Sequence, residues 1–307
     1  MLFYFAPLEG ITNYIYRNTY AQFYSKADKY FTPFLNVNAA GIIATKSQRD
    51  VAPENNKNLP VIPQLLTNDS TAFKIIETTL CDEGYKEINL NLGCPSGTVT
   101  SKGRGSGQLK DTDKLKKFLD DIFTHPQTAI SIKTRIGFSS PAEMETLLPL
   151  FNAYPLKELI VHPRVREDYY KGAIHLDVFQ DIVKEAHAPL CYNGDLFTVE
   201  QIKQFTHDFP SINRIMLGRG IISNPGLLKE YKTGMTSDRE TFKKFHDSLL
   251  SQYSAILFGD RNILFKMKDC WKIWRLNFLT NPQGIKKIQK SQNISAYQSA
   301  VDSLLQS

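Results

Sequence analysis

Short apolar runs rich in β-branched and aromatic residues recur along the chain, and longer stretches with apolar residues at helical spacing separate them. The short runs have the length and composition of buried strands. We predict strands over Phe3–Ala6, Tyr30–Phe34, Val61–Leu65, Ile88–Asn91, Ala129–Thr134, Glu158–His162, Leu190–Asn193 and Arg214–Gly218. We predict helices between them over Ser70–Glu83, Thr112–Phe123, Pro141–Asn152, Leu176–Ala186 and Val199–Phe205.

Eight strands that alternate with helices predict an α/β fold, a parallel (β/α)8 barrel. A doubly wound sheet is the competing fold, but it usually carries a GxGxxG motif after its first strand, and this chain has none there. Past Gly226 the strand signals stop, and a linker over Tyr231–Ser237 leads to helical patterns. We therefore expect a catalytic barrel over residues 1–235 and a small all-α domain over 236–307. Its predicted helices are Asp238–Phe258, Asn262–Leu279 and Pro282–Leu305.

The composition fits a folded protein of a reducing compartment. Among 307 residues, 42% are hydrophobic and 11% aromatic, which excludes a mainly disordered chain. No apolar run approaches the roughly 20 residues that cross a bilayer, and the start of the chain lacks the basic lead of a secretory signal. The four cysteines are far apart in sequence and form no CxxC pair, so we expect no disulfide framework and no metal site. A cytoplasmic location follows as an expectation.

The formal charge of +6 is concentrated at one end of the chain. Residues 236–307 contain 11 Lys and Arg against 6 Asp and Glu, whereas the first 235 residues contain 26 against 25. This excess indicates either a solvated helical face or a surface for a polyanion. Lys268, Lys272 and Arg275 form a basic stripe that is a candidate phosphate contact. The neighbouring apolar stripe is predicted to be core: Leu264, Met267, Trp271, Trp274 and Phe278.

Polar side chains stand where most of the predicted strands end. In a parallel barrel the carboxyl ends of the strands share one face, and a buried polar side chain there needs a hydrogen-bond partner. A polar ligand above the barrel is therefore expected. The residues in question are Gln64, Asn91, Lys133, Arg135, His162, Arg164, Asn193 and Arg219.

The last two strand ends are candidate phosphate loops. Asn193-Gly194-Asp195 follows the seventh strand and Gly218-Arg219-Gly220 follows the eighth. Glycines let backbone N–H groups approach an anion, although ordinary tight turns also use them. Lys133 is suited to hold the negative charge of a reduced flavin, and the Gln64 amide to contact its pyrimidine edge. Similar groups would also satisfy the hydrogen-bonding groups of a nicotinamide or a sugar phosphate, so these residue types do not identify the cofactor.

Cys94 is the cysteine with a reactive context. It lies just past the fourth strand, between Gly93 and Pro95, and a segment rich in Gly and Ser with two basic residues follows it. We expect this segment to be mobile. A thiol with a pKa of about 8.5 is mostly protonated near pH 7, so Cys94 is a candidate proton donor or, as the thiolate, a nucleophile.

Six motifs in this order resemble the dihydrouridine synthase family, whose members reduce uridine in RNA. They are Ala6-Pro-Leu-Glu-Gly-Ile-Thr12, Asn89-Leu-Asn-Leu-Gly-Cys-Pro95, Lys133-Thr-Arg135, His162-Pro-Arg164, Asn193-Gly-Asp195 and Gly218-Arg-Gly220. The resemblance implies an FMN-containing (β/α)8 barrel, a helical domain that contacts tRNA, and NADPH as the reductant of FMN. It implies that Cys94 is the general acid and that Asn91, Arg135 and Arg164 lie near the target base. The residues implied around FMN are Pro7, Leu8, Glu9, Gln64, Lys133, His162, Asn193, Gly194, Asp195, Gly218 and Arg219.

Two other functions stay open from the sequence. A flavin barrel that reduces a free pyrimidine or enone would share the same site but has no use for a basic helical tail. A barrel that binds RNA without chemistry would carry no flavin. Structured RNA other than tRNA is also possible as the substrate, and a monomer is expected because no exposed apolar seam is evident.

Overall fold

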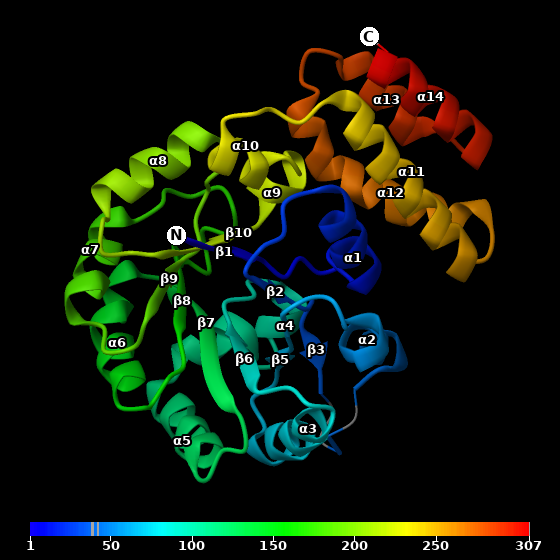
Figure 1. Ribbon diagram of the computed structural model, residues 1–307. Helices are drawn as coiled ribbons and strands as arrows, with labels where there is room; N and C mark the ends of the chain where they lie inside the picture. The colour runs from blue at the N-terminus through cyan, green and yellow to red at the C-terminus, as the bar shows by residue number, and fades with distance from the viewer. Residues whose placement is uncertain (38–39, 42, 307) are drawn as a thin grey trace. The chain divides into compact units, whose positions relative to one another are not determined.

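The computed structural model describes residues 1–37, 40–41 and 43–306, so Ser307, the end of the predicted helical domain, lies outside the described residues (Figure 1). The described chain forms ten strands, and every pairing between them is parallel. They are β1 (Leu2–Phe5), β2 (Lys29–Phe31), β3 (Leu35–Asn36), β4 (Val61–Ile62), β5 (Gln64–Leu66), β6 (Glu87–Leu92), β7 (Ala129–Gly137), β8 (Leu159–Val165), β9 (Leu190–Tyr192) and β10 (Arg214–Leu217).

The sheet closes into a barrel of eight strands. Its order is β3-β5-β6-β7-β8-β9-β10-β1-β2-β4. Two of the barrel strands are interrupted: β2 and β3 are pieces of one, and β4 and β5, separated by Pro63, which has no N–H to donate, are pieces of the next. Since β3 pairs with β5 at one end of the order and β2 pairs with β4 at the other, the same two strands close the barrel. Each of the eight predicted runs overlaps one of these barrel strands, and the predicted (β/α)8 fold is confirmed.

Helices connect the strands, and further helices come after the last strand in the chain. They are α1 (Tyr14–Phe23), α2 (Thr45–Val51), α3 (Ser70–Asp82), α4 (Gly97–Thr100), α5 (Thr112–Phe123), α6 (Met144–Asn152), α7 (Leu176–Glu185), α8 (Val199–Asp208), α9 (Arg219–Ser223), α10 (Leu227–Thr233), α11 (Arg239–Ile256), α12 (Asp260–Trp274), α13 (Pro282–Lys290) and α14 (Ile294–Gln306). Single 3-10 turns lie at Pro53–Asn55, Pro141–Glu143 and Arg275–Asn277, and a longer one at Gly105–Lys110. Asp69 and Asp111 accept hydrogen bonds from the first turns of α3 and α5, which explains where these helices begin.

The prediction of one helix over Pro282–Leu305 was wrong, because the chain leaves the helical conformation between α13 and α14. Ser291 has an extended ψ of 140°, and its hydroxyl donates to the Ile288 carbonyl at 2.7 Å. The Asn293 side chain accepts from the Ala296 N–H at 2.8 Å and so caps α14. Short polar side chains that bond to nearby backbone compete with a continuous helix.

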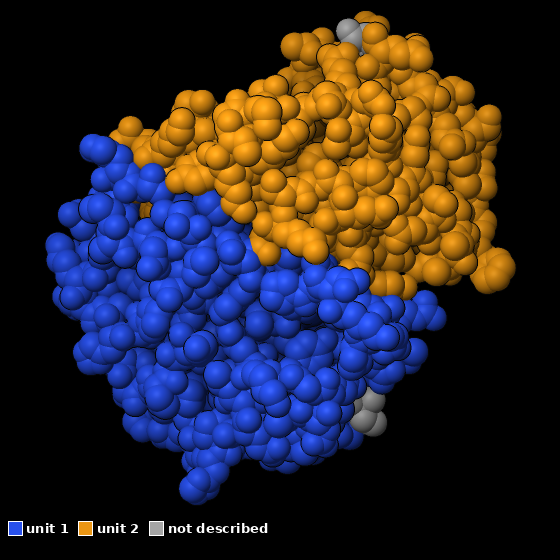
Figure 2. Space-filling model, viewed as in Figure 1, with its two compact units in different colours: residues 1–7, 28–194, 206–217 blue, residues 8–27, 195–205, 218–307 orange. Residues whose placement is uncertain are grey.

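The contacts divide the chain into two compact units (Figure 2). The first unit comprises residues 1–7, 28–194 and 206–217 and contains the whole sheet. The second comprises residues 8–27, 195–205 and 218–307 and contains α1 and the helices from α9 onward. The expected assignment of catalysis to residues 1–235 and RNA binding to 236–307 stays a prediction. No helix in the described ranges is both long and apolar enough to cross a membrane.

Charged residues occupy the amino ends of the barrel strands in the first unit. Buried Glu158 accepts from Tyr4 Oη at 2.8 Å and pairs with Arg214 Nε at 2.9 Å, and Lys29 Nζ pairs with Glu87 at 2.8 Å. Burial raises the pKa of the Glu158 carboxyl. Buried charges need partners, and these pairs provide them at the amino ends of the strands.

The second unit has an aromatic core. All five residues of the predicted apolar stripe are buried, which confirms that prediction. Trp274 is fully buried, packs edge-on against Phe242 with ring centroids 5.3 Å apart, and donates from Nε1 to Tyr16 Oη at 3.3 Å.

We expect Trp274→Ala to lower the free energy of unfolding of the second unit by about 3–5 kcal/mol, because the substitution leaves a large cavity in a packed core. Urea unfolding followed by circular dichroism measures the loss. Leu279→Ala is the control, since Leu279 is 71% exposed, and it should change the stability by less than about 0.5 kcal/mol. Equal effects of the two substitutions would contradict the assignment of Trp274 to the core.

Candidate active site

The strand register places polar side chains in layers inside the barrel. Gln64 of β5 lies opposite Asn89 of β6, which lies opposite Ser131 of β7. Two residues further along the strands, Asn91 lies opposite Lys133. Because residues two apart on a strand share a face, both layers face the same way, and Gln64, Asn89 and Ser131 are fully buried.

Four of these side chains form a hydrogen-bonded series that we call the amide chain: Ser131, Asn89, Gln64 and Asn91. Asn89 Nδ2 donates to Ser131 Oγ at 2.9 Å, Gln64 Nε2 donates to Asn89 Oδ1 at 2.7 Å, and Asn91 Nδ2 donates to Gln64 Oε1 at 2.7 Å. The amide chain satisfies groups that would be costly to bury alone. Gln64 and Asn91 were predicted as site residues, whereas Asn89 and Ser131 were not.

The amide chain ends on the backbone that carries Cys94. Asn91 Oδ1 accepts from the N–H groups of Gly93 at 3.0 Å and Cys94 at 2.9 Å. On its other side, the Cys94 carbonyl accepts from Ser106 Oγ at 2.8 Å. The Cys94 thiol is half-buried and forms no disulfide. The position of the cysteine is therefore fixed by two polar partners from different segments.

The glycine-rich segment after Cys94 is folded rather than the open loop we expected. It forms α4 and the 3-10 turn Gly105–Lys110, and Ser106 within it is fully buried. Gly105 has a φ of +57°, and a Cβ there would lie 3.0 Å from Cys94 Cβ. The glycine thus permits close packing on the cysteine. The glycine content of a segment does not tell whether its glycines serve packing or flexibility.

Lys133 is a half-buried cation, and no carboxylate of the described residues pairs with it. Burial lowers the pKa of its ammonium to about 8, and the positive charge of Arg135 acts in the same direction. The thiols of Cys191 and Cys94 act in the opposite direction. Within the described ranges its ammonium makes no ion pair or hydrogen bond, which leaves it available to an anionic or carbonyl ligand.

Arg135 and Arg164 hold the loop that follows β8. Arg135 donates to the carbonyls of Gly93 at 2.9 Å, Val165 at 2.8 Å and Tyr169 at 2.6 Å. Arg164 Nε donates to the Gly172 carbonyl at 2.7 Å. Arg135 therefore joins the loop 165–172 to the strand end that carries Cys94. Their expected contact with a base stays a prediction.

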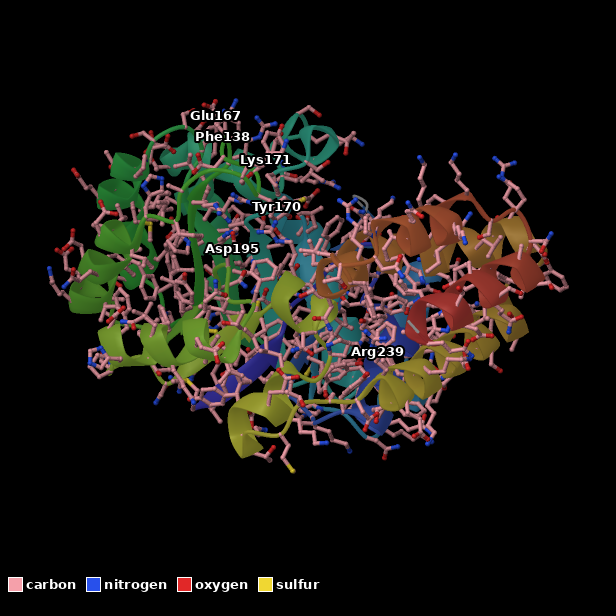
Figure 3. All side chains as sticks on the ribbon, turned by 90° about the horizontal axis from the view of Figure 1, so that it is seen from above. Phe138, Glu167, Tyr170, Lys171, Asp195 and Arg239 are labelled. Atoms are coloured by element: carbon pink, nitrogen blue, oxygen red, sulfur yellow. The ribbon has the colours of Figure 1, made fainter. Side chains whose placement is uncertain are left out.

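Tyr170 is a further candidate that the sequence reasoning missed (Figure 3). Its side chain is 51% exposed, its ring stacks on the predicted site residue His162 with centroids 6.4 Å apart, and the Arg135 guanidinium lies 5.4 Å from the ring centroid. An exposed, supported aromatic ring is a platform on which a nucleobase stacks. The signal in the sequence was the pair of tyrosines between Arg164 and Gly172.

The predicted phosphate loops have internal partners. In the first unit, Asn193 Nδ2 donates to the Met216 carbonyl at 2.9 Å, and a Cβ on Gly194 would lie 2.0 Å from Tyr192 Oη. In the second unit, Arg219 pairs with Asp195, and a Cβ on Gly220 would lie 1.9 Å from the Leu196 carbonyl oxygen. These glycines are required by close packing of the protein itself.

The remaining predicted residues lie as follows. Pro7 follows β1 in the first unit, while Leu8, Glu9 and Gly218 belong to the second unit. In the basic stripe, Lys268 donates to the Ser291 carbonyl, Lys272 pairs with Asp269 at 2.6 Å, and Arg275 Nε donates to the Lys272 carbonyl at 3.1 Å. The structure therefore brings Gln64, Asn91, Cys94 and Lys133 together on neighbouring strands of one unit.

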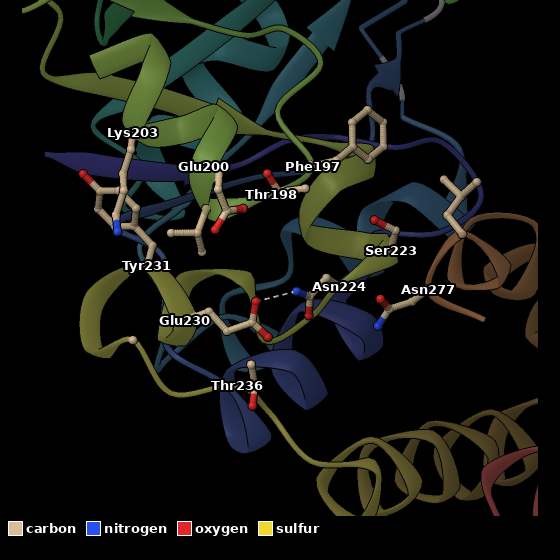
Figure 4. A pocket seen from close by; sticks show the side chains of 13 residues that line it. Phe197, Thr198, Glu200, Lys203, Ser223, Asn224, Glu230, Tyr231, Thr236 and Asn277 are labelled. Atoms are coloured by element: carbon tan, nitrogen blue, oxygen red, sulfur yellow. Dashed lines mark hydrogen bonds between the residues drawn. The ribbon is translucent and has the colours of Figure 1, made fainter. Parts of the chain in front are cut away.

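A separate cavity of about 490 Å³ lies within the second unit (Figure 4). It is lined by residues such as Phe197, Tyr231 and Glu230, whose carboxylate accepts from Asn224 Nδ2 at 2.8 Å. None of the predicted site residues lines this cavity.

Comparison with known proteins identifies relatives along most of the chain. A family model described as dihydrouridine synthase (Dus) matches residues 4–266. A probable tRNA-dihydrouridine synthase of Staphylococcus epidermidis is 26% identical over 261 residues, which cover 82% of this chain and 78% of that protein. A tRNA-dihydrouridine(16) synthase of Pseudomonas putida is 28% identical over 233 residues, covering 72% and 70%.

Solved structures share the fold. Morphinone reductase in complex with tetrahydroNAD superimposes with a TM-score of 0.51 at 11% identity, covering 78% of this chain and 89% of that chain. A variant of NCR from Zymomonas mobilis superimposes with a TM-score of 0.53 at 15% identity, covering 76% and 87%. At these identities the likeness shows the barrel fold alone.

We expect the Lys133 amine to titrate near pH 8, whereas a lysine in a free peptide titrates at about 10.4. Acetylation by a trace reagent, mapped by mass spectrometry over a pH series, measures this because only the neutral amine reacts. Lys114 is the control, since its ion pair with Asp111 raises its pKa. Parallel profiles for Lys133 and Lys114 would contradict the assignment of Lys133 to a desolvated, unpaired position.

Proposed function

The chain belongs to the dihydrouridine synthase family, and we propose that it reduces the C5–C6 double bond of a uridine in tRNA to 5,6-dihydrouridine. The observation that carries the proposal is the arrangement of Cys94 and Lys133. The Cys94 backbone is held by Asn91 and Ser106, and Asn91 lies opposite Lys133, a cation with no ion pair in the described chain, in the register of β6 and β7. Reduction of a carbonyl-conjugated double bond needs both a positioned proton donor and stabilisation of negative charge.

FMN is the proposed cofactor. The donor set fits its pyrimidine ring: Lys133 offers a cation with no protein partner in the described chain, and Gln64 offers an amide in a fully buried position. His162 within β8 and Asn193 just after β9 complete the proposed ring contacts in the first unit. The other FMN contacts that the resemblance implies stay predictions: Pro7, Leu8, Glu9, Gly194, Asp195, Gly218 and Arg219.

Arg219 is the proposed phosphate contact, and its ion pair with Asp195 affects how its guanidinium is oriented. Arginine has five N–H donors in a planar fork, and the Asp195 carboxylate accepts from one of the Arg219 nitrogens. Asp195 would thus orient Arg219. NADPH is the proposed source of electrons.

When bound, FMN supplies the hydride that adds to C6 of the uracil ring. Cys94 Sγ then gives its proton to C5, which completes the reduction, and the thiolate recovers a proton from water. Lys133 stabilises the negative charge that the site must hold while the proton is transferred. Asn91 and Arg164 contact the target base, and Arg135 contributes by holding the loop with Tyr170 beside it. The uridine has to leave its stack to reach these groups.

The proposed function also includes a substrate, an oligomeric state and a location for the protein. The RNA is tRNA, which the names of the relatives support, and its phosphates account for the positive charge of residues 236–307. The enzyme acts as a monomer in the cytoplasm.

The decisive experiment uses the purified chain. Its visible spectrum should show a bound flavin, and an unmodified tRNA transcript incubated with the protein and NADPH should acquire dihydrouridine, mapped by reverse transcription. A colourless protein, or a coloured one that leaves the transcript unchanged, would refute the proposal. Reduction of free uridine at the same rate as the transcript would instead favour a reductase of small molecules.

We expect Cys94→Ala to lower dihydrouridine formation by roughly 10²–10⁴-fold, because a positioned general acid contributes that much. Flavin absorbance should be unchanged. Cys81→Ala is the control, since Cys81 is a half-buried free thiol on α3. Single-turnover reduction of the transcript measures both variants, and full activity of Cys94→Ala would show that another group delivers the proton.

Arg219→Ala should purify with less FMN than the wild-type chain, because it removes the proposed phosphate contact. The ratio of flavin to protein absorbance measures retention. Arg261→Ala, which removes an exposed arginine of α12, is the charge-matched control. Equal flavin content in the two variants would exclude Arg219 from the phosphate site.

A further inference from the structure

The hydrogen bonds of the amide chain all run in one direction, and the backbone beside the cysteine sets that direction. Backbone N–H groups can only donate, so Asn91 turns its Oδ1 toward the N–H groups of Gly93 and Cys94. The Asn91 nitrogen therefore faces Gln64, whose Oε1 accepts from it at 2.7 Å. The orientation of both amides follows from the two backbone donors.

The same requirement fixes the rest of the amide chain. Since the Gln64 oxygen faces Asn91, its nitrogen faces Asn89 and donates to Oδ1 at 2.7 Å. Asn89 then directs its own nitrogen to Ser131, whose hydroxyl oxygen accepts at 2.9 Å. Ser131 can end the series because a hydroxyl both accepts and donates, and its proton is directed to the Ile88 carbonyl at 3.5 Å. Each amide thus has one orientation that satisfies its neighbours.

This fixed direction decides which atoms remain for a ligand. The side-chain nitrogens of Gln64 and Asn91 each carry two N–H bonds, and one of the two is used within the amide chain. The second N–H of each has no acceptor among the described residues. The Asn91 oxygen already accepts twice, and the Gln64 oxygen accepts from Asn91. The two amides therefore have donors to offer, while their oxygens are in use.

Lys133 adds a third donor beside the two amides. It lies opposite Asn91 in the register of β6 and β7, and β5, which carries Gln64, pairs with β6 on the other side. An ammonium has three N–H bonds and no acceptor. We call Gln64, Asn91 and Lys133 the donor set. A ligand that fits the donor set presents carbonyl or anionic oxygens, and a flavin pyrimidine ring carries two carbonyl oxygens and gains negative charge on reduction.

Asn89 holds the donor set from within the barrel. It anchors the nitrogen of the Gln64 amide while Asn91 anchors the oxygen, so the plane of this amide is fixed at both ends. Without Asn89 the amide is held at its oxygen alone and can rotate about that contact. Ser131 in turn fixes Asn89, and both residues are fully buried on the face that their strands share with Asn91 and Lys133.

We propose that Asn89 and Ser131 are positioning residues, which hold the Gln64 amide so that it directs an N–H donor to a carbonyl oxygen of the bound cofactor. A donor fixed in advance needs no reorganisation when negative charge develops on its acceptor. The donor set thereby favours the reduced, more negative form of the cofactor over the oxidised form. This inference rests on the proposed FMN and assigns a role to two residues that do not themselves contact it.

The test uses the full-length chain, freed of flavin and titrated with FMN by fluorescence quenching. Asn89→Leu removes the acceptor for the Gln64 nitrogen with a side chain of similar size. Asn89→Asp keeps an oxygen for Gln64, and the Ser131 hydroxyl can turn to donate to the other oxygen. Ser131→Ala removes the end of the series. Thermal unfolding of each variant shows whether it is folded.

Thr134→Val is the matched control for the loss of a buried polar group. Thr134 lies on the same strand as Ser131, is fully buried, and donates its hydroxyl to the Arg135 carbonyl at 2.8 Å. Its side chain lies on the opposite face of β7, because it is three residues from Ser131 and successive side chains alternate. It therefore takes no part in the amide chain.

We expect Asn89→Leu to bind FMN about 3- to 10-fold more weakly than the wild-type chain, the range that the loss of one oriented hydrogen bond produces. Ser131→Ala should weaken binding about 2- to 3-fold, because it acts through Asn89. Asn89→Asp and Thr134→Val should keep the wild-type affinity within about 2-fold. If the lost contact favours the reduced form by the same 3- to 10-fold, the midpoint potential of the flavin in Asn89→Leu falls by about 15–30 mV, whereas Thr134→Val leaves it unchanged.

Wild-type affinity and potential in a folded Asn89→Leu variant would overturn the proposal. It would also be overturned by an Asn89→Asp variant that binds FMN as weakly as Asn89→Leu, since the acceptor for Gln64 would then not matter. A wild-type chain that shows the expected differences in FMN binding but forms no dihydrouridine would refute the proposed reaction and leave the positioning roles standing. The two failures are therefore distinguishable.

Discussion

Polar groups buried inside a barrel must all be hydrogen-bonded, and the amide chain is how this protein meets that requirement. Ser131, Asn89, Gln64 and Asn91 satisfy one another across three strands, and the last of them holds the Cys94 backbone. Apolar side chains at these positions would fill the interior equally well but would leave the strand end after β6 without its polar anchor. The position of the cysteine thus depends on hydrogen bonds made deep in the barrel.

Buried charged groups inside the barrel differ in whether they have partners of opposite charge. At the amino ends of the strands, Glu158 and Glu87 have cationic partners. Further along the barrel, Lys133 within β7 has none in the described chain, and desolvation lowers its pKa. Strongly shifted pKa values are more frequent at functional sites than elsewhere, so this asymmetry supports the proposed site.

The barrel could be predicted from the sequence because apolar runs and helical spacing are local signals, and all eight strands were found in this way. The candidate site could be predicted in part, because Gln64, Asn91, Cys94 and Lys133 lie in or just after strands that the apolar runs predict. Asn89 and Ser131 were missed, because their role depends on register between strands. The break at Ser291 was missed because the capping action of Asn293 is a matter of side-chain geometry. Gly105, Gly194 and Gly220 could not be interpreted from sequence, since the atoms they must accommodate come from other segments.

Arg135 links the residue before Cys94 to the loop that carries Tyr170. One planar guanidinium joins the carbonyls of Gly93, Val165 and Tyr169, so the residue before the cysteine and the loop that carries Tyr170 are tethered to the same rigid body. A displacement of that loop is transmitted to the neighbourhood of the thiol without any change in the strands. Insertions or deletions between β8 and α7 would therefore perturb the backbone beside Cys94 as well as the loop that carries Tyr170.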